Sequence, residues 1–464
     1  MSHSILSDAY QHVYLYPFLG ERVMPRKDFR SALLASGALI LLLAAGPAWA
    51  QATTERVSVG PGGIEANDFT VGHGLGLSAT GRYAVFESSA TNLATAPIGK
   101  YFDVYVRDRN DGTNQLVSRT WNGRRPDGSS GDGIITPDGR FVAFASTSTN
   151  LVRGDTNFLG DIFVRNLRTG KTERVSVASD GHEGNGESYG PSISADGRFV
   201  AFYSIASNLV SGDTNGGTDT FVHDRQTGTT VRVDLGPGRA QSNGGHDSFA
   251  WQRTVMSADG RFVGFISSAT NLVPNDTNGV VDVFVRDRLR GTTELISRGA
   301  GNRADGESFV PSISANGRFV AFMSRATNLV RGDTNGYYDI FVRDRLTQTT
   351  RRVSVGAGGV QANGFCGDPF ISADGQVVAY QSDATNLVAG DRNGLIDIFV
   401  SATSGGKTER VSVTANGQEA NDESTGQPAL SARGRIVLFA SEGTNLVPGD
   451  ANGVADAFVR VRSP

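Results

Sequence analysis

A nine-residue pattern returns seven times along the chain at nearly constant intervals, and this repetition limits the possible folds more than any other feature. Ser194–Phe202 reads Ser-Ala-Asp-Gly-Arg-Phe-Val-Ala-Phe, and Ser257–Phe265 and Ser314–Phe322 each differ from it at one position. The pattern's glycine is found at Gly81, Gly139, Gly197, Gly260, Gly317, Gly375 and Gly434. Seven copies of one unit of roughly 58 residues predict a repeat architecture, either stacked or closed into a ring.

Each unit is predicted to contain four short strands. For the third unit we predict strands at Pro191–Ser194, Arg198–Ser204, Asp219–Asp224 and Thr230–Leu235. The Asp196-Gly197 turn suits the positive φ angles that hairpins require. The second strand is apolar on both faces and should be buried, whereas the fourth strand in most units alternates polar with apolar residues. Burial that falls from the inner to the outer strand is typical of a propeller blade.

The two ends of the repeat array complement each other. The last unit stops at Asp456–Arg462 and lacks a fourth strand, while residues 54–59 are an unattached copy of that strand. We therefore predict an all-β fold over residues 51–464: a seven-bladed β-propeller of four-stranded antiparallel blades. The N-terminal strand would complete the last blade and cover its edge. An open solenoid of stacked β units is the alternative, but it does not explain the complementary ends.

The first fifty residues differ in composition from the repeats. Arg26, Lys27 and Arg30 precede an apolar run over residues 32–45, and the segment ends in Ala-Trp-Ala at residue 50. A basic start, a short apolar core and small residues at the end are typical of a secretory signal peptide. The run is shorter than the roughly 20 residues of a membrane span, which makes a membrane anchor the weaker alternative. We predict a signal peptide over residues 1–50, with Met24 as an alternative start, and a periplasmic or secreted protein.

Composition narrows the classes of partner and of activity. The formal net charge of −4 is mild and gives no reason to expect a nucleic-acid or anionic-membrane partner. Cys366 is the single cysteine, so no disulfide can form within the chain. The sequence contains no Gly-x-Ser-x-Gly elbow, no His-Glu-x-x-His and no phosphate-binding loop. These features favour a binding protein over an enzyme.

The repeat also resembles a known family. Ser-x-Asp-Gly-Arg-Phe-Val-Ala-Phe, followed in the unit by strands such as Asp339–Asp344 (Asp-Ile-Phe-Val-Arg-Asp), is similar to the WD40-like PD40 repeats of TolB-type propellers. The resemblance covers nearly all of residues 54–462 and implies a β-propeller, but it implies no activity. TolB proteins also carry an N-terminal α/β domain, for which this chain has no room. We therefore expect a TolB-like propeller and not TolB itself.

The long loop between the second and third strands carries the pattern Asp-x-Asn-Gly-x-x-Asp in five units. Clustered carboxylate and amide oxygens around a glycine turn suit Ca²⁺, so these loops are predicted calcium sites. The alternative is structural, because Asn-Gly makes a turn and Asp side chains cap backbone N–H groups. The candidate ligands are Asp213, Asn215 and Asp219; Asp276, Asn278 and Asp282; Asp333, Asn335 and Asp339; Asp391, Asn393 and Asp397; and Asp450, Asn452 and Asp456.

Two loops depart from the repeat and are candidates for a unique ligand site. The loop before the second unit's nine-residue pattern holds Trp121, Arg124 and Arg125. The corresponding loop of the fourth unit, which is longer than the others, holds His246, Asp247, Trp251 and Arg253. Aromatic and polar side chains on one loop could bind a sugar or a peptide. The alternative is loop variation with incidental packing.

Together these observations predict an exported, non-enzymatic binding or scaffold propeller. It would engage a protein, a peptide or an envelope glycan through the face that carries its long loops, with calcium as an optional aid. The alternative is a glycan-active hydrolase or lyase with acidic residues near the propeller axis. An enzyme should show a unique carboxylate or histidine cluster in a central pocket, whereas a scaffold should show near-equivalent loops around a shallow funnel.

Overall fold

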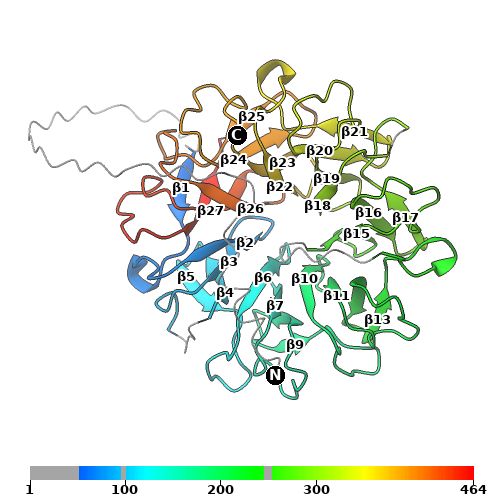
Figure 1. Cartoon of the computed structure of the whole chain (residues 1–464). Helices are drawn as coiled ribbons and strands as arrows, with labels where there is room; N and C mark the ends of the chain where they lie inside the picture. Colours follow the sequence, from blue (N-terminus) through cyan, green and yellow to red (C-terminus); the bar gives the residue numbers. More distant parts are fainter. Residues whose placement is uncertain (1–51, 96–100, 245–252, 302, 464) are drawn as a thin grey trace, which may run out of the picture. The chain divides into compact units, whose positions relative to one another are not determined.

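The computed structural model describes residues 52–95, 101–244, 253–301 and 303–463. Within these residues it contains 28 strands and three short 3₁₀ turns, η1 (Pro61–Gly63), η2 (Pro237–Arg239) and η3 (Ala357–Gly359). The strands pair into seven four-stranded sheets, which Figure 1 shows as blades around a common axis. The predicted seven-bladed propeller is therefore confirmed. The predicted signal peptide, residues 1–50, lies outside the described residues.

The blades follow one another in chain order, and within blades 1 to 6 the strands are neighbours in sequence order, whereas in blade 7 the N-terminal strand takes the outermost place. Blades 1 to 4 are β2 (Thr70–Leu77), β3 (Tyr83–Ser88), β4 (Asp103–Asp108) and β5 (Thr113–Leu116); β6 (Ser130–Ile135), β7 (Phe141–Ser146), β8 (Asp161–Asn166) and β9 (Thr172–Arg174); β10 (Ser188–Ile193), β11 (Phe199–Ser204), β12 (Asp219–Asp224) and β13 (Thr229–Arg232); and β14 (Val255–Met256), β15 (Phe262–Ser267), β16 (Asp282–Asp287) and β17 (Thr292–Leu295). Blades 5 to 7 are β18 (Ser308–Ile313), β19 (Phe319–Ser324), β20 (Asp339–Asp344) and β21 (Thr349–Arg352); β22 (Cys366–Ile371), β23 (Val377–Ser382), β24 (Asp397–Ala402) and β25 (Thr408–Arg410); and β26 (Ser424–Leu430), β27 (Ile436–Ser441), β28 (Asp456–Val461) and β1 (Thr53–Arg56).

The observed strands of blade 3 differ from the predicted ones mainly at the two edges of the sheet. The first strand begins at Ser188, earlier than predicted, because a β-bulge between Tyr189 and Ser192 lets it continue toward the long loop. The fourth strand ends at Arg232 instead of Leu235. Leu235 donates its backbone N–H to the carbonyl of Val233, only two residues back, which turns the chain out of the ladder.

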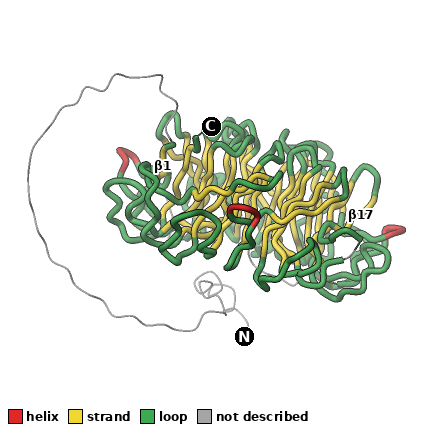
Figure 2. Tube along the Cα trace, turned by 90° about the horizontal axis from the view of Figure 1, so that it is seen from above, coloured by secondary structure: helices red, strands yellow, loops and turns green. Residues whose placement is uncertain are grey.

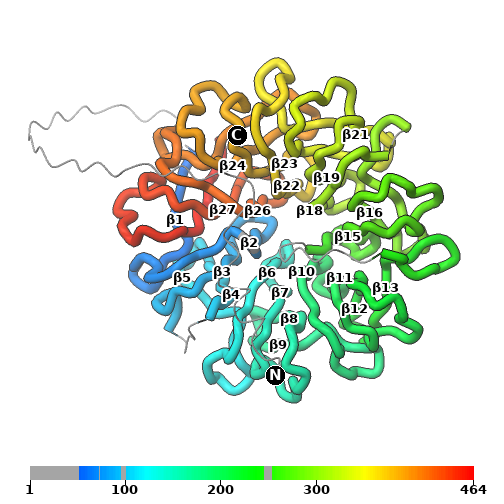
Figure 3. Tube along the Cα trace, in the orientation of Figure 1, coloured from blue at the N-terminus to red at the C-terminus, as the bar shows by residue number. Residues whose placement is uncertain are grey.

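The N-terminal strand completes the seventh blade, as predicted. β1 pairs antiparallel with β28, from Thr53 opposite Val461 to Arg56 opposite Phe458. Side chains reinforce the closure, because Ser58 Oγ donates a hydrogen bond to Asp456 Oδ1. In Figure 3 the blue start of the described chain lies beside its red end. The first strand therefore covers an edge that blade 7 would otherwise leave open.

Aromatic pairs between the second and third strands fill each blade. In blade 3 the rings of Phe202 and Phe221 stack with their centroids 6.0 Å apart, and both side chains are fully buried. The equivalent pairs are Phe86–Tyr105, Phe144–Phe163, Phe265–Phe284, Phe322–Phe341, Tyr380–Phe399 and Phe439–Phe458. The most constant apolar positions of the sequence repeat thus form the core.

The repeated Ser-x-Asp-Gly-Arg segment forms the turn between the first and second strands. Ser194 Oγ donates to Asp196 Oδ1 at 2.6 Å and accepts the backbone N–H of Phe199 at 2.9 Å. Gly197 has a φ of 75°, and a Cβ there would lie 2.4 Å from Cδ2 of Phe141 in the neighbouring blade. The turn and the close contact both require glycine, which gives the motif a structural role in every blade.

Backbone hydrogen bonds join these turns around the axis. Six such bonds run from Ala79 to Pro137, Ala195 to Ala258, Ala258 to Ala315, Ala315 to Ala373, Asp374 to Ala432, and Ala432 to Ala79. Each joins an N–H group to a carbonyl of a neighbouring blade. The link between blades 2 and 3 cannot form in the same way, because Pro137 has no N–H group to donate.

The connections divide the propeller into two different faces. The turns between first and second strands and between third and fourth strands are short, and the alternation of strand direction places them together on what we call the short-turn face. The other two connections are long and share the long-loop face. Figure 2 shows the strands as a middle layer with loops on both sides. Among the described residues, no helix has the length and apolar character needed to cross a membrane.

Candidate functional site

Departures from the sevenfold repeat gather along the inner strands, beside the axis. In six blades the bulge of the first strand contains one residue with positive φ, and in three blades this residue is not glycine. These are Asp132 (φ 56°), Val310 (φ 47°) and Asp368 (φ 51°). The left-handed conformation costs an L-residue roughly 1–2 kcal/mol. Backbone strain of this kind is found preferentially at functional sites.

Glu87 of β3 lies between blades 1 and 2 and is 7% exposed. Its Oε1 accepts the backbone N–H of Asp132, and its carboxyl group packs against Gly74 and Gly131, where a Cβ would collide with it. Burial raises the pKa of Glu87 well above its ordinary value, and the negative charge of Asp132 raises it further, while Arg253 opposes both effects. This environment favours the protonated form of the carboxyl group.

Arg253, just before β14, is 7% exposed, and its Nη1 has no hydrogen-bond partner among the residues that the structure describes. It lines a cavity of about 180 Å³ on the axis, to which the first strands of all seven blades contribute. The other polar side chains of the wall are Ser192, Thr254, Ser312 and Gln427, and the remainder is apolar, as at Leu77. A guanidinium nitrogen without a partner among the described residues is a donor for an anionic or carbonyl-bearing ligand.

Amide groups from blades 6 and 7 complete the polar side chains at the axis. Gln381 donates from Nε2 to Asp368 Oδ2 at 2.6 Å and accepts the backbone N–H of Gly426 at 2.8 Å. Gln427 donates to the carbonyl of Pro369 at 3.3 Å. We call the following set the axial polar group: Glu87, Asp132, Arg253, Asp368, Gln381 and Gln427. Of these, Arg253 and Gln427 line the axial cavity, and the others lie at or against the bulges of blades 2 and 6.

Most of the axial polar group was not predicted from the sequence, although a signal was present. Counting back seven residues from the glycine of the repeated turn gives Gly74, Asp132, Gly190, Arg253, Val310 and Asp368 in the first six units. A change from glycine to a charged residue at this position marks the site. Arg253 was predicted as a ligand residue, and the structure places it in the wall of the axial cavity. His246, Asp247 and Trp251 lie outside the described residues.

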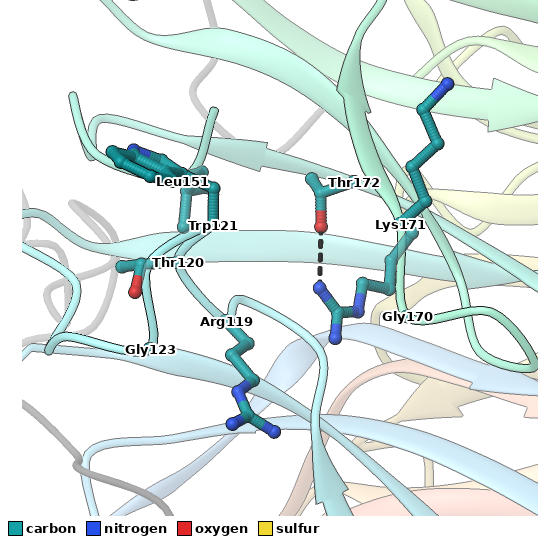
Figure 4. Close-up of a pocket in the computed structure, with 9 residues that line it drawn as sticks. Arg119, Thr120, Trp121, Gly123, Leu151, Gly170, Lys171 and Thr172 are labelled. Carbon is teal, nitrogen blue, oxygen red and sulfur yellow. Dashed lines mark hydrogen bonds between the residues drawn. The ribbon is translucent and has the colours of Figure 1, made fainter. Parts of the chain in front are cut away.

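Trp121 lies at a second pocket, beside the outer strand of blade 2 (Figure 4). We call this pocket of about 450 Å³ the rim pocket. It is lined by Arg119, Thr120, Trp121 and Gly123 after β5, by Leu151 between β7 and β8, and by Arg165, Gly170, Lys171 and Thr172 of β8, the following turn and β9. Trp121 is half exposed, and the guanidinium carbon of Arg153 lies 4.2 Å from its ring centroid.

Arg124 and Arg125, which were predicted to join Trp121 in a ligand site, do not line the rim pocket. Their backbone carbonyls brace the loop: Arg124 accepts a hydrogen bond from Thr120 Oγ1 at 2.6 Å, and Arg125 accepts one from Asn150 Nδ2 at 2.9 Å. The structure instead brings Trp121 together with Arg119 and Arg165. The sequence places these two residues in different units, so their proximity is visible only in the fold.

The Asp-x-Asn-Gly-x-x-Asp loops surround an arginine of the outer strand. In blade 5, Arg352 Nη1 lies 3.0 Å from Asp333 Oδ1 and 3.2 Å from Asp339 Oδ2. Asp339 also accepts hydrogen bonds from Asn335 at 2.8 Å and Ser354 at 2.5 Å. In four other blades an arginine likewise lies between two aspartates: Arg56 between Asp450 and Asp456, Arg174 between Asp155 and Asp161, Arg232 between Asp213 and Asp219, and Arg410 between Asp391 and Asp397. In blade 4, Arg303 lies 3.5 Å from Asp276 instead.

These contacts give the aspartates a structural partner, an arginine, that was not predicted from the sequence. The guanidinium occupies the space between two carboxylates that a cation would take, so a bound calcium ion would have to displace it. Among the described residues, no group of three or more His, Cys, Asp or Glu side chains is arranged to hold a metal. Burial raises the pKa of Asp213 and that of Asp391 to about 6, although the neighbouring arginines lower it. Calcium binding at these loops stays a prediction.

Comparisons with known proteins find similarity at the level of the fold. No protein-family model matches the chain, and no curated protein does. The β-propeller domain of the Trilobed protease from Pyrococcus furiosus aligns with 84% of this chain and 93% of its own length, at a TM-score of 0.51 and 10% identity. An oligogalacturonate lyase from Vibrio parahaemolyticus aligns with 89% of this chain and 97% of its own length, at a TM-score of 0.52 and 13% identity.

TolB from Acinetobacter baumannii aligns with 82% of this chain and 80% of its own length, at a TM-score of 0.38 and 13% identity. At identities this low the similarity shows a shared propeller fold and says nothing about activity. The Trilobed protease propeller is described as having an open Velcro topology, whereas β1 closes the ring here. Membership of the PD40 repeat family stays a prediction.

Proposed function

We propose that this protein is an exported, non-enzymatic propeller that binds a protein, a peptide or an envelope glycan through its long-loop face. The periplasm or the cell exterior is its proposed location, on the strength of the sequence of residues 1–50. The observation that carries the proposal is the axial polar group. A repeat that is otherwise uniform carries different charged and amide side chains at one place, as recognition of an asymmetric ligand requires.

The direction of the inner strands connects the axial polar group to the long-loop face. Each first strand runs from that face toward the short-turn face, and its bulge comes before most of the residues that line the axial cavity. Asp132 and Asp368, at the bulges, therefore lie on the long-loop side of the cavity. Arg253 occupies the equivalent position of the repeat in blade 4, so a ligand seated on this face would meet these carboxylates and the guanidinium at the same level of the repeat.

The contacts of Glu87 favour binding over catalysis. Its carboxyl group is enclosed by Gly74 and Gly131 and accepts a backbone hydrogen bond, which fixes the bulge of blade 2. A general acid must reach the atom that it protonates. The raised pKa of Glu87 beside Asp132 is nevertheless the one observation that supports the alternative, a glycan-active hydrolase or lyase.

Thermal unfolding of the full chain with a panel of probes tests the proposal. The probes are neutral and acidic oligosaccharides, soluble peptidoglycan fragments and short peptides. A probe that binds the native state should raise the Tm, and at 100 times its Kd the stabilisation is about 2.7 kcal/mol. The double variant Asp132→Gly, Arg253→Gln should lose this shift, while the exposed-charge control Arg290→Gln should keep it. An equal shift in the double variant, or no shift with any probe, would overturn the proposal.

Chromatography of the same probes after incubation separates binding from catalysis. We expect every probe to be recovered intact. Cleavage products that disappear in Glu87→Gln would instead establish the enzymatic alternative and would make Glu87 the acid.

A further inference from the structure

A hydrogen bond between the outer strand of one blade and the loop of the preceding blade occurs at six of the seven blade interfaces. In each case the side chain two residues before the end of the outer strand donates to a backbone carbonyl. The pairs are Thr54 to Val413, Asn114 to Val59, Thr230 to Val177, Thr293 to Leu235, Thr350 to Arg298 and Thr408 to Val355, with distances of 2.5–2.7 Å. These bonds draw the loop against the next blade.

The interface between blades 1 and 2 lacks this bond. The equivalent atoms are Thr172 Oγ1 and the carbonyl of Arg119, both in the described part of the chain. Thr172 Oγ1 accepts a hydrogen bond from Arg165 Nη1 at 2.9 Å, which is the dashed line in Figure 4. The equivalent side chains of blades 1, 4, 5 and 7 accept the same bond from their own arginine, so blade 2 differs only in lacking the donation to the loop carbonyl. The rim pocket of about 450 Å³ lies between the loop and the strand at this place.

Cationic side chains line the rim pocket. Arg119 stands where five other blades have Val or Leu. Arg165 is 6% exposed, and burial together with the charge of Arg119 lowers its pKa. Lys171 is exposed, with Nζ 3.7 Å from Glu173, whose Oε1 already accepts a hydrogen bond from Arg225. None of the nine residues that line the pocket is acidic.

Arg165 also has unused hydrogen-bonding capacity. The arginines at the same position in blades 1, 4, 5 and 7 each donate to a carbonyl of the preceding loop: Arg107 to Val59, Arg286 to Leu235, Arg343 to Arg298 and Arg460 to Thr414. Arg165 makes no such bond, and this missing carbonyl distinguishes it from the other arginines. Its Nε has no partner among the described residues, as is also the case for Arg343 and Arg460. Two neighbouring guanidinium groups, one of them buried and with N–H groups that have no acceptor among the described residues, form a site that suits an anion.

We propose that the rim pocket binds an anionic sugar unit. The carboxylate or phosphate of the sugar lies between Arg119 and Arg165, and the sugar ring packs against Trp121. A guanidinium binds either anion through two parallel hydrogen bonds. The indole of Trp121 is half exposed, and the part of it that the guanidinium of Arg153 does not cover offers an apolar surface to a ring. The pocket volume lies within the range of about 300–1,000 Å³ typical of small-ligand sites. This site is separate from the axial polar group, so the two proposals can fail independently.

The probes that test this inference are glucuronate, glucose 6-phosphate and glucose, titrated into the full chain by calorimetry. We expect at least one of the two charged sugars to bind and glucose not to bind. The affinity should weaken as salt concentration rises, because the site is cationic. The two charged arms distinguish a carboxylate from a phosphate source, and competition by inorganic phosphate identifies the anion site itself.

Three variants test the roles of the lining residues. Two of them introduce the residue that another blade has at the same position, and the third removes the indole that the sugar ring would contact. Arg119→Val and Arg165→Ser, which match Val177 and Ser401 of other units, should each weaken binding at least about tenfold, because one charge-assisted hydrogen bond is lost. Trp121→Ala should weaken the binding of the charged sugars while leaving the binding of inorganic phosphate unchanged, since both arginines remain. Arg298→Val, at the same position in blade 4, is the matched control and should bind normally.

Unfolding of each variant shows whether it keeps the fold, and Arg119→Val should keep or raise the Tm because it removes a like-charge contact. The inference is overturned if neither charged sugar binds at up to about 10 mM, if glucose binds equally well, or if folded Arg119→Val binds with unchanged affinity. Equal binding of inorganic phosphate and glucose 6-phosphate would refute the role of the sugar ring.

Discussion

Glu87 shows how a single side chain can hold a strained backbone in place. Its carboxyl group accepts the N–H of Asp132, the residue with positive φ in the bulge of blade 2, and its burial disfavours the charged form. The repeat places Ala, Tyr, Ile, Met or Gln at this position in the other blades. A neutral, hydrogen-bonding side chain of the same length should therefore serve the fold equally well.

We expect Glu87→Gln to gain stability relative to the wild type as the pH rises. The pKa of Glu87 is raised in the folded state, so the native protein binds a proton that the unfolded chain has already released. The free energy of unfolding of the wild type should then fall as the pH rises from the unfolded pKa toward the folded one. The amide of the variant does not titrate, so denaturant unfolding at pH 5, 7 and 9 should show a widening difference. A constant difference would contradict the burial of an ionisable carboxyl group.

A second prediction at this scale concerns Asp132 itself. At a φ of 56°, glycine should be more stable than alanine by about 1 kcal/mol, the reverse of their order in an ordinary strand. Unfolding midpoints of Asp132→Gly and Asp132→Ala measure this difference directly. Both variants keep the backbone N–H that Glu87 accepts. Equal stability of the two variants would show that the bulge relaxes.

At the scale of strands and loops, the long loop between the second and third strands is anchored by the outer strand of its own blade in blades 2, 3, 5, 6 and 7. Arg352 of β21 and the carboxylates of Asp333 and Asp339 are all buried, with side chains at most 9% exposed. The sequence motif supplies the acidic groups, and the Thr-x-Arg pattern of the outer strand supplies the cation. This pairing makes loop and strand one unit.

Removal of the arginine should be costly. Arg352→Met leaves two buried carboxylates without their counter-charge, which typically costs about 3–5 kcal/mol. Arg351→Met, on the exposed side of the same strand, should change stability by less than about 0.5 kcal/mol. Urea unfolding of both variants gives the comparison. A similar, small effect in both would mean that the loop does not depend on the ion pair.

The same loops carry the calcium prediction, which thermal unfolding in EDTA and in millimolar Ca²⁺ tests. Because the guanidinium already lies between the carboxylates, we expect the wild-type Tm to be the same in both. In Arg352→Met, where the carboxylates are unpaired, Ca²⁺ should raise the Tm. A calcium-dependent rise in the wild type that is lost in Asp333→Ala, Asp339→Ala would establish a native metal site.

The strands could be predicted from the sequence, but the sites only in part. Seven copies of the glycine turn, four of them Asp-Gly, and of the apolar second strand indicate the strand positions repeatedly. The bulges that display Asp132 and Asp368 depend on the register between two strands, which a local pattern does not contain. Similarly, the sequence shows that Arg119 stands where most other units have Val or Leu. It does not show that the hydrogen bond between Thr172 and this loop is missing, because that bond depends on how two blades pack together.

At the scale of the whole molecule, β1 contacts both blades that meet where the ring closes, blade 7 and blade 1. It pairs with β28 of blade 7, and Glu55 of β1 accepts a hydrogen bond from Arg109 of blade 1 at 2.5 Å. Arg56 lies 3.1 Å from Asp450 and 3.2 Å from Asp456. The closure of the ring therefore depends on charge pairs as well as on the ladder.

Deletion of residues 52–59 should destabilise the propeller by at least about 3–5 kcal/mol, because Asp450 and Asp456 would stay buried without a partner. A synthetic peptide of the same sequence, added in excess, should restore part of the lost stability, and a scrambled peptide should not. Calorimetric unfolding of the deletion variant with each peptide measures the effect. An unchanged Tm after the deletion would show that blade 7 is stable as three strands.

The closure of the ring also has a consequence for the timing of biosynthesis. The ribosome makes β1 before any blade and β28 after all the others, and the bonded pair Ser58 and Ala457 are 399 positions apart. The first strand must therefore wait, unpaired, until translation of the last repeat is finished. A chain that ends before β28 would leave β1 without a partner and the last completed blade with an uncovered neighbour. A protease or chaperone can recognise such an unpaired strand. The first strand is therefore paired, and its edge covered, only when the last repeat has been synthesised.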